Sequence, residues 1–334
     1  KKSVFPARRG FAIPVFMRSH WITNPARAST ALSLTLSPFG LGCDCFFLRS
    51  RIPMSSSTIP PLNTAALLQE YGLRPKKKLG QNFLQDPAIL DKIVRAAGVT
   101  EKDTVLEIGP GLGSLTRHLA AAAKEVLAVE IDRDLIPPLK ASLSGYANTT
   151  VIQGDMLKIS PSEIINAPEY LVVANIPYYI TSALLRHLLS NDPRPRSMVL
   201  TIQKEIAKRI CAEEGKKMSL LALSVQVYGK PEIAANIPAG AFHPPPKVDS
   251  SVIQIELYNE PRIPTHLLDD FFRLAKAGYS QKRKTLRNAL AGGLRISTTQ
   301  VEDLLHAVEI DPRRRAETLT IKEWGKLSEK WVEK

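Results

Sequence analysis

Cysteine is scarce in this chain, which limits what can hold the fold together. Three cysteines occur in 334 residues, and two of them lie close together in the first 53 residues, in CDC. The rest of the chain contains only Cys211. A lone cysteine supports neither a disulfide framework nor a cysteine-based zinc cluster. We therefore expect a reducing, intracellular compartment and no metal site.

Long apolar runs are also missing. No stretch reaches the roughly 18 consecutive apolar residues that a membrane-spanning helix needs, so the sequence predicts no membrane span. Hydrophobic residues make up 44% of the chain and charged residues 23%, as is typical of globular proteins. The length fits one large domain and one small domain.

Acidic residues are nearly absent from residues 1–53, which hold eight Lys or Arg and one acid, Asp44. This leader therefore carries more than half of the net charge of +13, and the rest favours polyanionic partners only modestly. An Arg-rich, acid-poor leader is typical of an organelle transit peptide. The alternative is an over-extended reading frame upstream of a start at Met54. We leave the leader out of the fold prediction and expect a cytoplasmic protein, or an organellar one if the leader is a transit peptide.

Strand and helix patterns alternate from residue 86 onwards. Residues 86–98 predict a helix that Asp86 caps, that Pro87 begins and that Gly98 ends. Short, continuous runs of β-branched residues between helices predict strands buried on both faces, and hence a largely parallel α/β sheet. The expected strands are DTVLEIG, EVLAVEI, TTVIQGD, YLVVAN and SMVLTIQ.

Strand patterns stop near residue 260. The stretches THLLDDFFRLAKAGYSQKRKTLRNALAGG and TTQVEDLLHAVEI have a helical pattern. We therefore predict a large domain over residues 54–260, beginning with a short helix capped by Asn63, and a small helical C-terminal domain over residues 261–334.

A glycine-rich loop, EIGPGLGSLT, follows the first expected strand of the sheet. Gly109, Gly111 and Gly113 would let a ligand approach the backbone where a Cβ would clash. The dinucleotide fingerprint would need its third glycine where Ser114 stands, which argues against NAD. Glu107 would be unfavourable beside a pyrophosphate, but its charge is tolerable near a sulfonium ligand that contains an amino acid.

Polar side chains end three further strands. Glu130 stands where an acid can bind both hydroxyls of a ribose, and Asp155 could accept a hydrogen bond from the exocyclic amine of adenine. Asn175 ends the next strand, and the ends of parallel strands converge on one crevice. Either acid alone could be a solvated carboxylate. Their shared position predicts an adenosine-containing cofactor, and S-adenosylmethionine fits best.

The segment NIPYYI, residues 175–180, places an amide, a proline and an aromatic ring at a strand end. The N6 amine of adenine is a poor nucleophile, because its lone pair is drawn into the ring. Two hydrogen-bond acceptors would hold this nitrogen towards tetrahedral geometry and aim it at a methyl group. The Asn175 oxygen and a backbone carbonyl of Ile176 or Pro177 could supply them, while Tyr178 stacks on an extruded base. The alternative is a strand-end turn with a buried tyrosine.

Eight motifs resemble, in order and spacing, those of the ribosomal RNA adenine N6-dimethyltransferase family. They are KKKLGQNFL, EIGPGLGSLT, VEID, QGDM, NIPYYIT, QKE, FHPPPKVDSSV and KRKTLRN. The resemblance implies a Rossmann-like class I methyltransferase domain with a small helical domain, and S-adenosylmethionine as cofactor. It also implies transfer of two methyl groups to each of two adjacent adenosines near the 3′ end of small-subunit rRNA.

Carried over position by position, the resemblance assigns roles to single residues. The cofactor contacts would be Asn82, Leu84, Gly109, Gly111, Glu130, Asp155 and Asn175. The target base would be handled by Asn175, Pro177 and Tyr178. Phe242, in FHPPPKV, would close on the other face of the base. The alternative for Phe242 is a core phenylalanine.

Two other functions stay open at this point. The family's commoner NLPY is NIPY here, as in relatives that methylate one large-subunit adenine and confer macrolide resistance. Against those relatives stand the lysine run before LGQNFL and the closing IDPRRRAETLT, both typical of the small-subunit enzymes. The second alternative is an assembly checkpoint that binds immature small subunits, with methylation secondary.

Basic residues gather in two places and would contact RNA phosphates. They are Lys76, Lys77 and Lys78 in RPKKK, and Lys282, Arg283, Lys284 and Arg287 within about two helical turns of SQKRKTLRNAL. The alternative for each group is a solvated basic surface. We expect small-subunit rRNA in an immature ribosomal subunit as the partner, and a monomeric protein.

Overall fold

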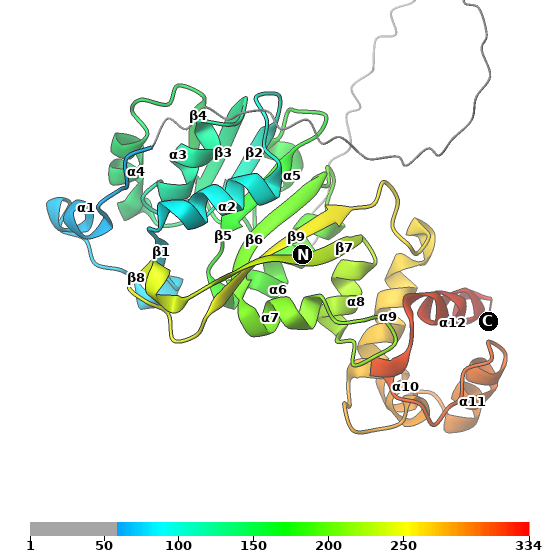
Figure 1. Ribbon diagram of the computed structural model, residues 1–334. Helices are drawn as coiled ribbons and strands as arrows, with labels where there is room; N and C mark the ends of the chain where they lie inside the picture. Colours follow the sequence, from blue (N-terminus) through cyan, green and yellow to red (C-terminus); the bar gives the residue numbers. More distant parts are fainter. Residues whose placement is uncertain (1–58, 334) are drawn as a thin grey trace, which may run out of the picture. The chain divides into compact units, whose positions relative to one another are not determined.

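The computed structural model describes residues 59–333 (Figure 1). The leader proposed for residues 1–53 lies outside these residues and stays a prediction. In the part of the chain that is described, no helix is both long and apolar enough to cross a membrane.

A seven-stranded sheet organises the fold, in the order β4-β3-β2-β5-β6-β9-β7 (Figure 1). Strands β2 to β6 pair in parallel, and β9 pairs antiparallel with both β6 and β7. The strands are β2 (Thr104–Ile108), β3 (Glu125–Glu130), β4 (Thr149–Gln153), β5 (Leu171–Asn175), β6 (Ser197–Gln203), β7 (Gly229–Ile237) and β9 (Ser250–Leu257). The five expected strands are therefore confirmed, as is a mostly parallel α/β sheet.

The two antiparallel strands, β7 and β9, were not predicted, and the sequence of β7 shows little of the apolar pattern that indicates a buried strand. Within residues 59–333, strand β7 pairs only with β9, exposes most of its side chains and contains Pro231, which an edge strand tolerates. A criterion based on continuous apolar runs misses such a strand. A separate two-stranded ladder joins β1 (Phe83–Leu84) to β8 (Phe242–His243).

Alternate residues along the central strands face opposite sides of the sheet. Val105 packs with α2 (Pro87–Ala97) and α3 (Ser114–Ala120), whereas Leu106 packs with α6 (Thr181–Ser190) and α8 (Leu220–Gln226). Helix α2 has the predicted ends: the Asp86 side chain accepts from the backbone N–H of Ala88 at 2.9 Å, and Gly98 ends the helix in the left-handed conformation.

Four shorter helices complete this α/β part. They are α1 (Thr64–Glu70), α4 (Ile136–Ser142), α5 (Pro161–Ile164) and α7 (Lys204–Ile210). Helix α1 begins after Asn63, whose side chain accepts from the backbone N–H of Ala66 at 3.0 Å, as predicted.

The C-terminal region is helical, as expected. It comprises α9 (Leu268–Tyr279), α10 (Leu286–Leu294), α11 (Thr298–His306) and α12 (Ile321–Val332). Phe271 and Trp324 belong to the same buried cluster as Leu200 of the sheet. The expected domain boundary at residue 260 falls between β9 and α9, and the division into domains stays a prediction.

The stretch around SQKRK does not form one continuous helix, contrary to the prediction. The chain turns between α9 and α10, so that Lys282 to Lys284 lie in a turn and only Arg287 lies in a helix. The two helices pack so closely that a Cβ added at Gly293 would lie 2.6 Å from the Cβ of Ala277. This packing requires the chain to reverse direction, which helical periodicity alone does not reveal.

Candidate active site

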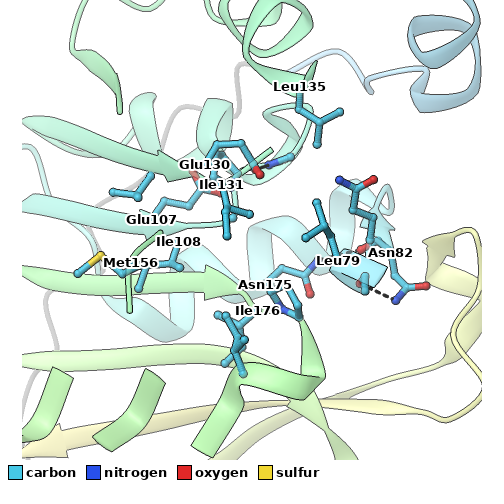
Figure 2. Close-up of a pocket in the computed structure, with 18 of the residues that line it drawn as sticks. Leu79, Asn82, Glu107, Ile108, Glu130, Ile131, Leu135, Met156, Asn175 and Ile176 are labelled. Atoms are coloured by element: carbon cyan, nitrogen blue, oxygen red, sulfur yellow. Dashed lines mark hydrogen bonds between the residues drawn. The ribbon is translucent and has the colours of Figure 1, made fainter. Parts of the chain in front are cut away.

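One pocket lies at the carboxyl ends of the parallel strands (Figure 2). Nine of the predicted site residues line it: Asn82, Leu84, Gly109, Gly111, Glu130, Asp155, Asn175, Pro177 and Tyr178. They come from the loops after β2, β3, β4 and β5 and from the segment that contains β1. The structure therefore brings together residues that are up to 96 positions apart in the sequence.

Glu130 is the last residue of β3 and is 4% exposed. One carboxylate oxygen accepts from the backbone N–H of Gly111 at 3.0 Å, and the other accepts from that of Asp132 at 2.8 Å. Burial raises the pKa of Glu130, and these backbone hydrogen bonds oppose that rise. Each oxygen keeps a lone pair, so the carboxylate is held in a fixed orientation with acceptor capacity to spare.

The glycine loop passes very close to the segment that contains β1. Gly111 has φ of +60°, and a Cβ there would lie 2.9 Å from two ring atoms of Phe83. Any side chain at this position would therefore strain the backbone and displace the Phe83 ring. Glycine at position 111 thus keeps the loop and Phe83 in contact.

Glu107 lies one residue before the end of β2, lines the pocket, and is 1% exposed. Its Oε2 atom is buried and makes no hydrogen bond within the described residues. Burial raises the pKa of Glu107 to about 8; the side chain of Thr116 opposes this rise in part, and the negative charge of Glu130 adds to it. Although several acids line the pocket, no group of three or more His, Cys, Asp or Glu in residues 59–333 is arranged to hold a metal ion.

Asn175, the last residue of β5, contacts Asn82 across the pocket (Figure 2). Its Nδ2 donates to the backbone carbonyl of Asn82 at 3.1 Å, and this hydrogen bond sets the orientation of the Asn175 amide. Oδ1 is thereby left to accept a hydrogen bond from a ligand. The Asn82 side chain in turn donates to the carbonyl of Gly80 at 3.1 Å.

Tyr178 follows Pro177 directly and begins a short 3₁₀ helix over Tyr178–Ile180. Its hydroxyl forms a hydrogen bond of 2.6 Å with the Ser250 hydroxyl, at the start of β9. Burial raises the pKa of Tyr178, and the Ser250 hydrogen bond opposes the rise. The ring is therefore anchored by its hydroxyl while it lines the pocket.

Apolar side chains complete the pocket, and most of them were not predicted. Ile131 follows Glu130 directly, and Met156 follows Asp155, so each acid has an apolar neighbour. The motifs VEID and QGDM contained this signal. Asp155 lies two residues beyond the end of β4, whereas the sequence placed it at the strand end. Asp155 itself accepts from the backbone N–H of Leu157 at 3.1 Å.

Phe242 is the one predicted base contact that does not line the pocket. It lies in β8, opposite Leu84 in β1, and is 4% exposed within the cluster formed by α2 and α3. In this structure Phe242 packs as a core phenylalanine, and its proposed contact with the base stays a prediction.

The predicted RNA-binding residues differ in their surroundings. Lys77 and Lys78 are exposed, as are Lys282, Arg283 and Lys284. Arg287, by contrast, forms an ion pair of 2.5 Å with Glu302. Lys76 also forms ion pairs, with Asp132 and Asp134.

The chain resembles known proteins over nearly all of its described length. A model of the family described as ribosomal RNA adenine dimethylase matches residues 72–331. A ribosomal RNA small subunit methyltransferase A of Dehalococcoides mccartyi is 46% identical over 280 residues, which cover 83% of this chain and 96% of that protein. A protein of the same name from Lysinibacillus sphaericus is 41% identical over 285 residues, covering 83% of this chain and 97% of that protein.

Solved structures show the same arrangement of elements. A dimethyladenosine transferase from Plasmodium falciparum aligns with a TM-score of 0.64 and 30% identity, over 75% of this chain and 98% of that one. A 23S rRNA methyltransferase, ErmE, aligns with a TM-score of 0.59 and 28% identity, over 75% of this chain and 99% of that one.

Proposed function

The chain belongs to the ribosomal RNA adenine dimethylase family, and from that premise we propose that it dimethylates two adjacent adenosines near the 3′ end of small-subunit rRNA, with S-adenosylmethionine as methyl donor. One observation carries the proposal most directly. Asn175 ends β5 with its Nδ2 committed to Asn82, so that Oδ1 is the end of the amide available to a substrate amine.

Two features of the pocket fit S-adenosylmethionine. The Oε2 atom of Glu107, which is buried and makes no hydrogen bond within the described residues, suits a ligand that carries positive charge, and the glycine at position 111 keeps the loop in contact with Phe83 at the border of the pocket. Glu130 would bind the ribose hydroxyls, and Asp155 would accept from the adenine amine. Asn82, Leu84 and Gly109 would contact the rest of the cofactor, whose activated methyl group is what it supplies to the reaction.

Two apolar residues would hold the adenine of this cofactor. Ile131 and Met156 both line the pocket beside the strand-end acids. Their positions suit contacts with the two faces of a flat ring, while the acids satisfy its polar edges.

The target adenine would lie beside the turn that follows β5. Asn175 Oδ1 and the carbonyl of Ile176 or Pro177 would each accept a hydrogen from the N6 amine. This arrangement holds the lone pair of the nitrogen towards the methyl group, and the amine releases a proton once the new C–N bond has formed. Tyr178 would stack on the extruded base, and its bond to Ser250 limits how far the ring can move.

The exposed basic residues would hold the RNA by its phosphates. Lys77 and Lys78 lie in the segment that borders the pocket, and Lys282, Arg283 and Lys284 lie in the turn before α10. Contacts of this kind fix the position of the RNA without reading its sequence. The protein would act as a monomer on an immature small subunit in the cytoplasm, or in an organelle if residues 1–53 are a transit peptide.

The small-subunit target is favoured over the large-subunit one by the similar proteins. The relatives that are 41–46% identical are named for the small subunit, whereas the 23S enzyme is 28% identical. Macrolide resistance on expression, with unchanged small-subunit methylation, would reverse this preference.

Mass spectrometry of rRNA nucleosides tests the proposal. Deleting the gene should remove N6,N6-dimethyladenosine from small-subunit rRNA, and the wild-type gene should restore it. Asn175→Ala should not restore it, because loss of a transition-state acceptor costs about 10²–10³ in rate. Asn191→Ala is the matched control, since that amide donates to the carbonyl of His187 within α6 and does not line the pocket.

Persistence of the dimethylated adenosines after deletion would end the proposal. If small subunits mature normally in cells that carry only the Asn175→Ala variant, then the protein supports assembly mainly by binding immature subunits and not by methylating them.

A further inference from the structure

Residues 76–84, which we call the strap, cross the pocket and are fastened on two sides. Six strap residues, Leu79 to Leu84, line the pocket. On one side the backbone carbonyl of Asn82 accepts from the Asn175 amide. Near the same point Gly80 approaches Pro177 and Tyr179 so closely that an added Cβ would lie 3.4 Å from each.

The other side of the strap is fastened by Lys76. Its Nζ lies 2.6 Å from Oδ1 of Asp132 and 2.7 Å from Oδ2 of Asp134. Gln81 donates to the second oxygen of Asp132 at 2.7 Å and accepts from the backbone N–H of Lys76, also at 2.7 Å. Two strap residues therefore hold both oxygens of one carboxylate.

Asp132 connects this arrangement to the acid proposed to bind the ribose. Its backbone N–H donates to Glu130, whose other oxygen accepts from Gly111. Asp132 is 4% exposed, so its charge depends on the strap for compensation. Burial would raise the pKa of Asp132, but the hydrogen bonds from Lys76 and Gln81 outweigh burial and lower it.

Lys76 differs in this respect from its two neighbours. The side chains of Lys77 and Lys78 are exposed and form no ion pair with any residue of the described chain. A lysine whose ammonium is shared by two carboxylates has little capacity left for a phosphate, whereas its neighbours are free to contact RNA.

We infer that Lys76 is a positioning residue of the cofactor pocket, which clasps the strap to Asp132 beside the ribose-binding acid, and is not an RNA contact. The inference rests on the proposed function, because it assigns the pocket to S-adenosylmethionine. Losing the clasp would free the strap on the Glu130 side and leave Asp132 without its cation. Cofactor affinity would fall, while RNA affinity would be kept.

The test compares Lys76→Met with Lys77→Met and Lys78→Met in the full-length protein. Calorimetric titration with S-adenosylhomocysteine measures cofactor affinity, and filter binding of a small-subunit rRNA fragment without cofactor measures RNA affinity. We expect Lys76→Met to weaken cofactor binding about tenfold or more, since a pair with a nearly buried partner is lost. Its RNA affinity should change by less than about twofold, and Lys77→Met and Lys78→Met should show the opposite pattern.

Two further variants separate the clasp from a general loss of folding. Lys76→Arg keeps the charge and should restore cofactor affinity to within about threefold of wild type. Lys76→Met combined with Asp132→Asn removes the unpaired carboxylate and should fold, yet should still bind cofactor weakly because the strap is not clasped.

The outcomes distinguish the inference from the proposed function. A wild-type protein that binds neither S-adenosylmethionine nor its demethylated product overturns the proposed function. A wild-type protein that binds cofactor normally, together with a Lys76→Met variant that keeps cofactor affinity but loses RNA affinity, overturns only the inference.

Discussion

Replacing Glu107 by glutamine measures how strongly the buried carboxyl destabilises the cofactor-free protein at alkaline pH. Burial raises the pKa of Glu107 from an ordinary 4.5 to about 8. Between these two values the unfolded chain has released a proton that the folded chain still holds, so the free energy of unfolding falls as pH rises. This contribution is fully present below about pH 4.5 and is lost as the pH rises through about 8. At about 1.4 kcal/mol per pH unit, the loss between about pH 5 and about pH 9 is about 4 kcal/mol.

Glutamine carries no titrating proton and should remove this pH dependence. Urea unfolding followed by circular dichroism measures the free energy of unfolding. The difference in this quantity between Glu107→Gln and the wild type should shift by about 4 kcal/mol in favour of the variant from about pH 5 to about pH 9. Glu329→Gln removes the same charge from an exposed position in α12 and should follow the wild-type curve. Parallel curves for the wild type and Glu107→Gln would refute the view that burial raises the pKa of this carboxyl to about 8.

Three further predictions test the pocket and the RNA contacts. Gly111→Ala should lower the free energy of unfolding by about 1–3 kcal/mol and weaken S-adenosylmethionine binding, because the added Cβ meets the Phe83 ring. Gly145→Ala is the control: nothing lies within 4 Å of its added Cβ, so calorimetry should show no change in either quantity. Tyr178→Phe keeps the ring and loses the Ser250 bond, so the methylation rate should fall by about tenfold or less, whereas Tyr178→Ala should reduce it by about a hundredfold. Changing Lys282, Arg283 and Lys284 together to glutamine should weaken RNA binding and reduce the slope of log affinity against log salt by about 2–3, without changing cofactor affinity; an unaltered slope would contradict phosphate contact.

Local sequence signals were enough for the parallel sheet and for most of the pocket. Strands β2, β3, β5 and β6 are mainly apolar and buried, β4 is a more exposed edge strand, and a parallel sheet places the carboxyl ends of all five together. Residues at those ends, such as Glu130 and Asn175, therefore had to meet. The caps of α2 were equally visible, because Asp, Pro and Gly each have a strong local preference at helix ends.

Features that depend on partners distant in sequence were not visible. In the sequence Lys76 is part of a basic run, and only the fold shows that its ammonium pairs with the carboxylate of Asp132, 56 positions later. The hydroxyl of Tyr178 bonds to Ser250, 72 positions away, and Phe242 is buried by its pairing with Leu84. The turn at Lys282 to Lys284 lets α10 pack back on α9, where Gly293 lies close to Ala277, and helical periodicity in the sequence does not reveal this contact.

The position of β9 has a consequence for the order in which the protein can be built during translation. Strand β9 is made after β7 but lies between β6 and β7 in the sheet, so β7 has no strand to pair with until β9 has left the ribosome. Ser250, the first residue of β9, is also what tethers the Tyr178 ring. A nascent chain that stops short of residue 250 can thus form the five parallel strands, but the Tyr178 ring that lines its pocket is untethered.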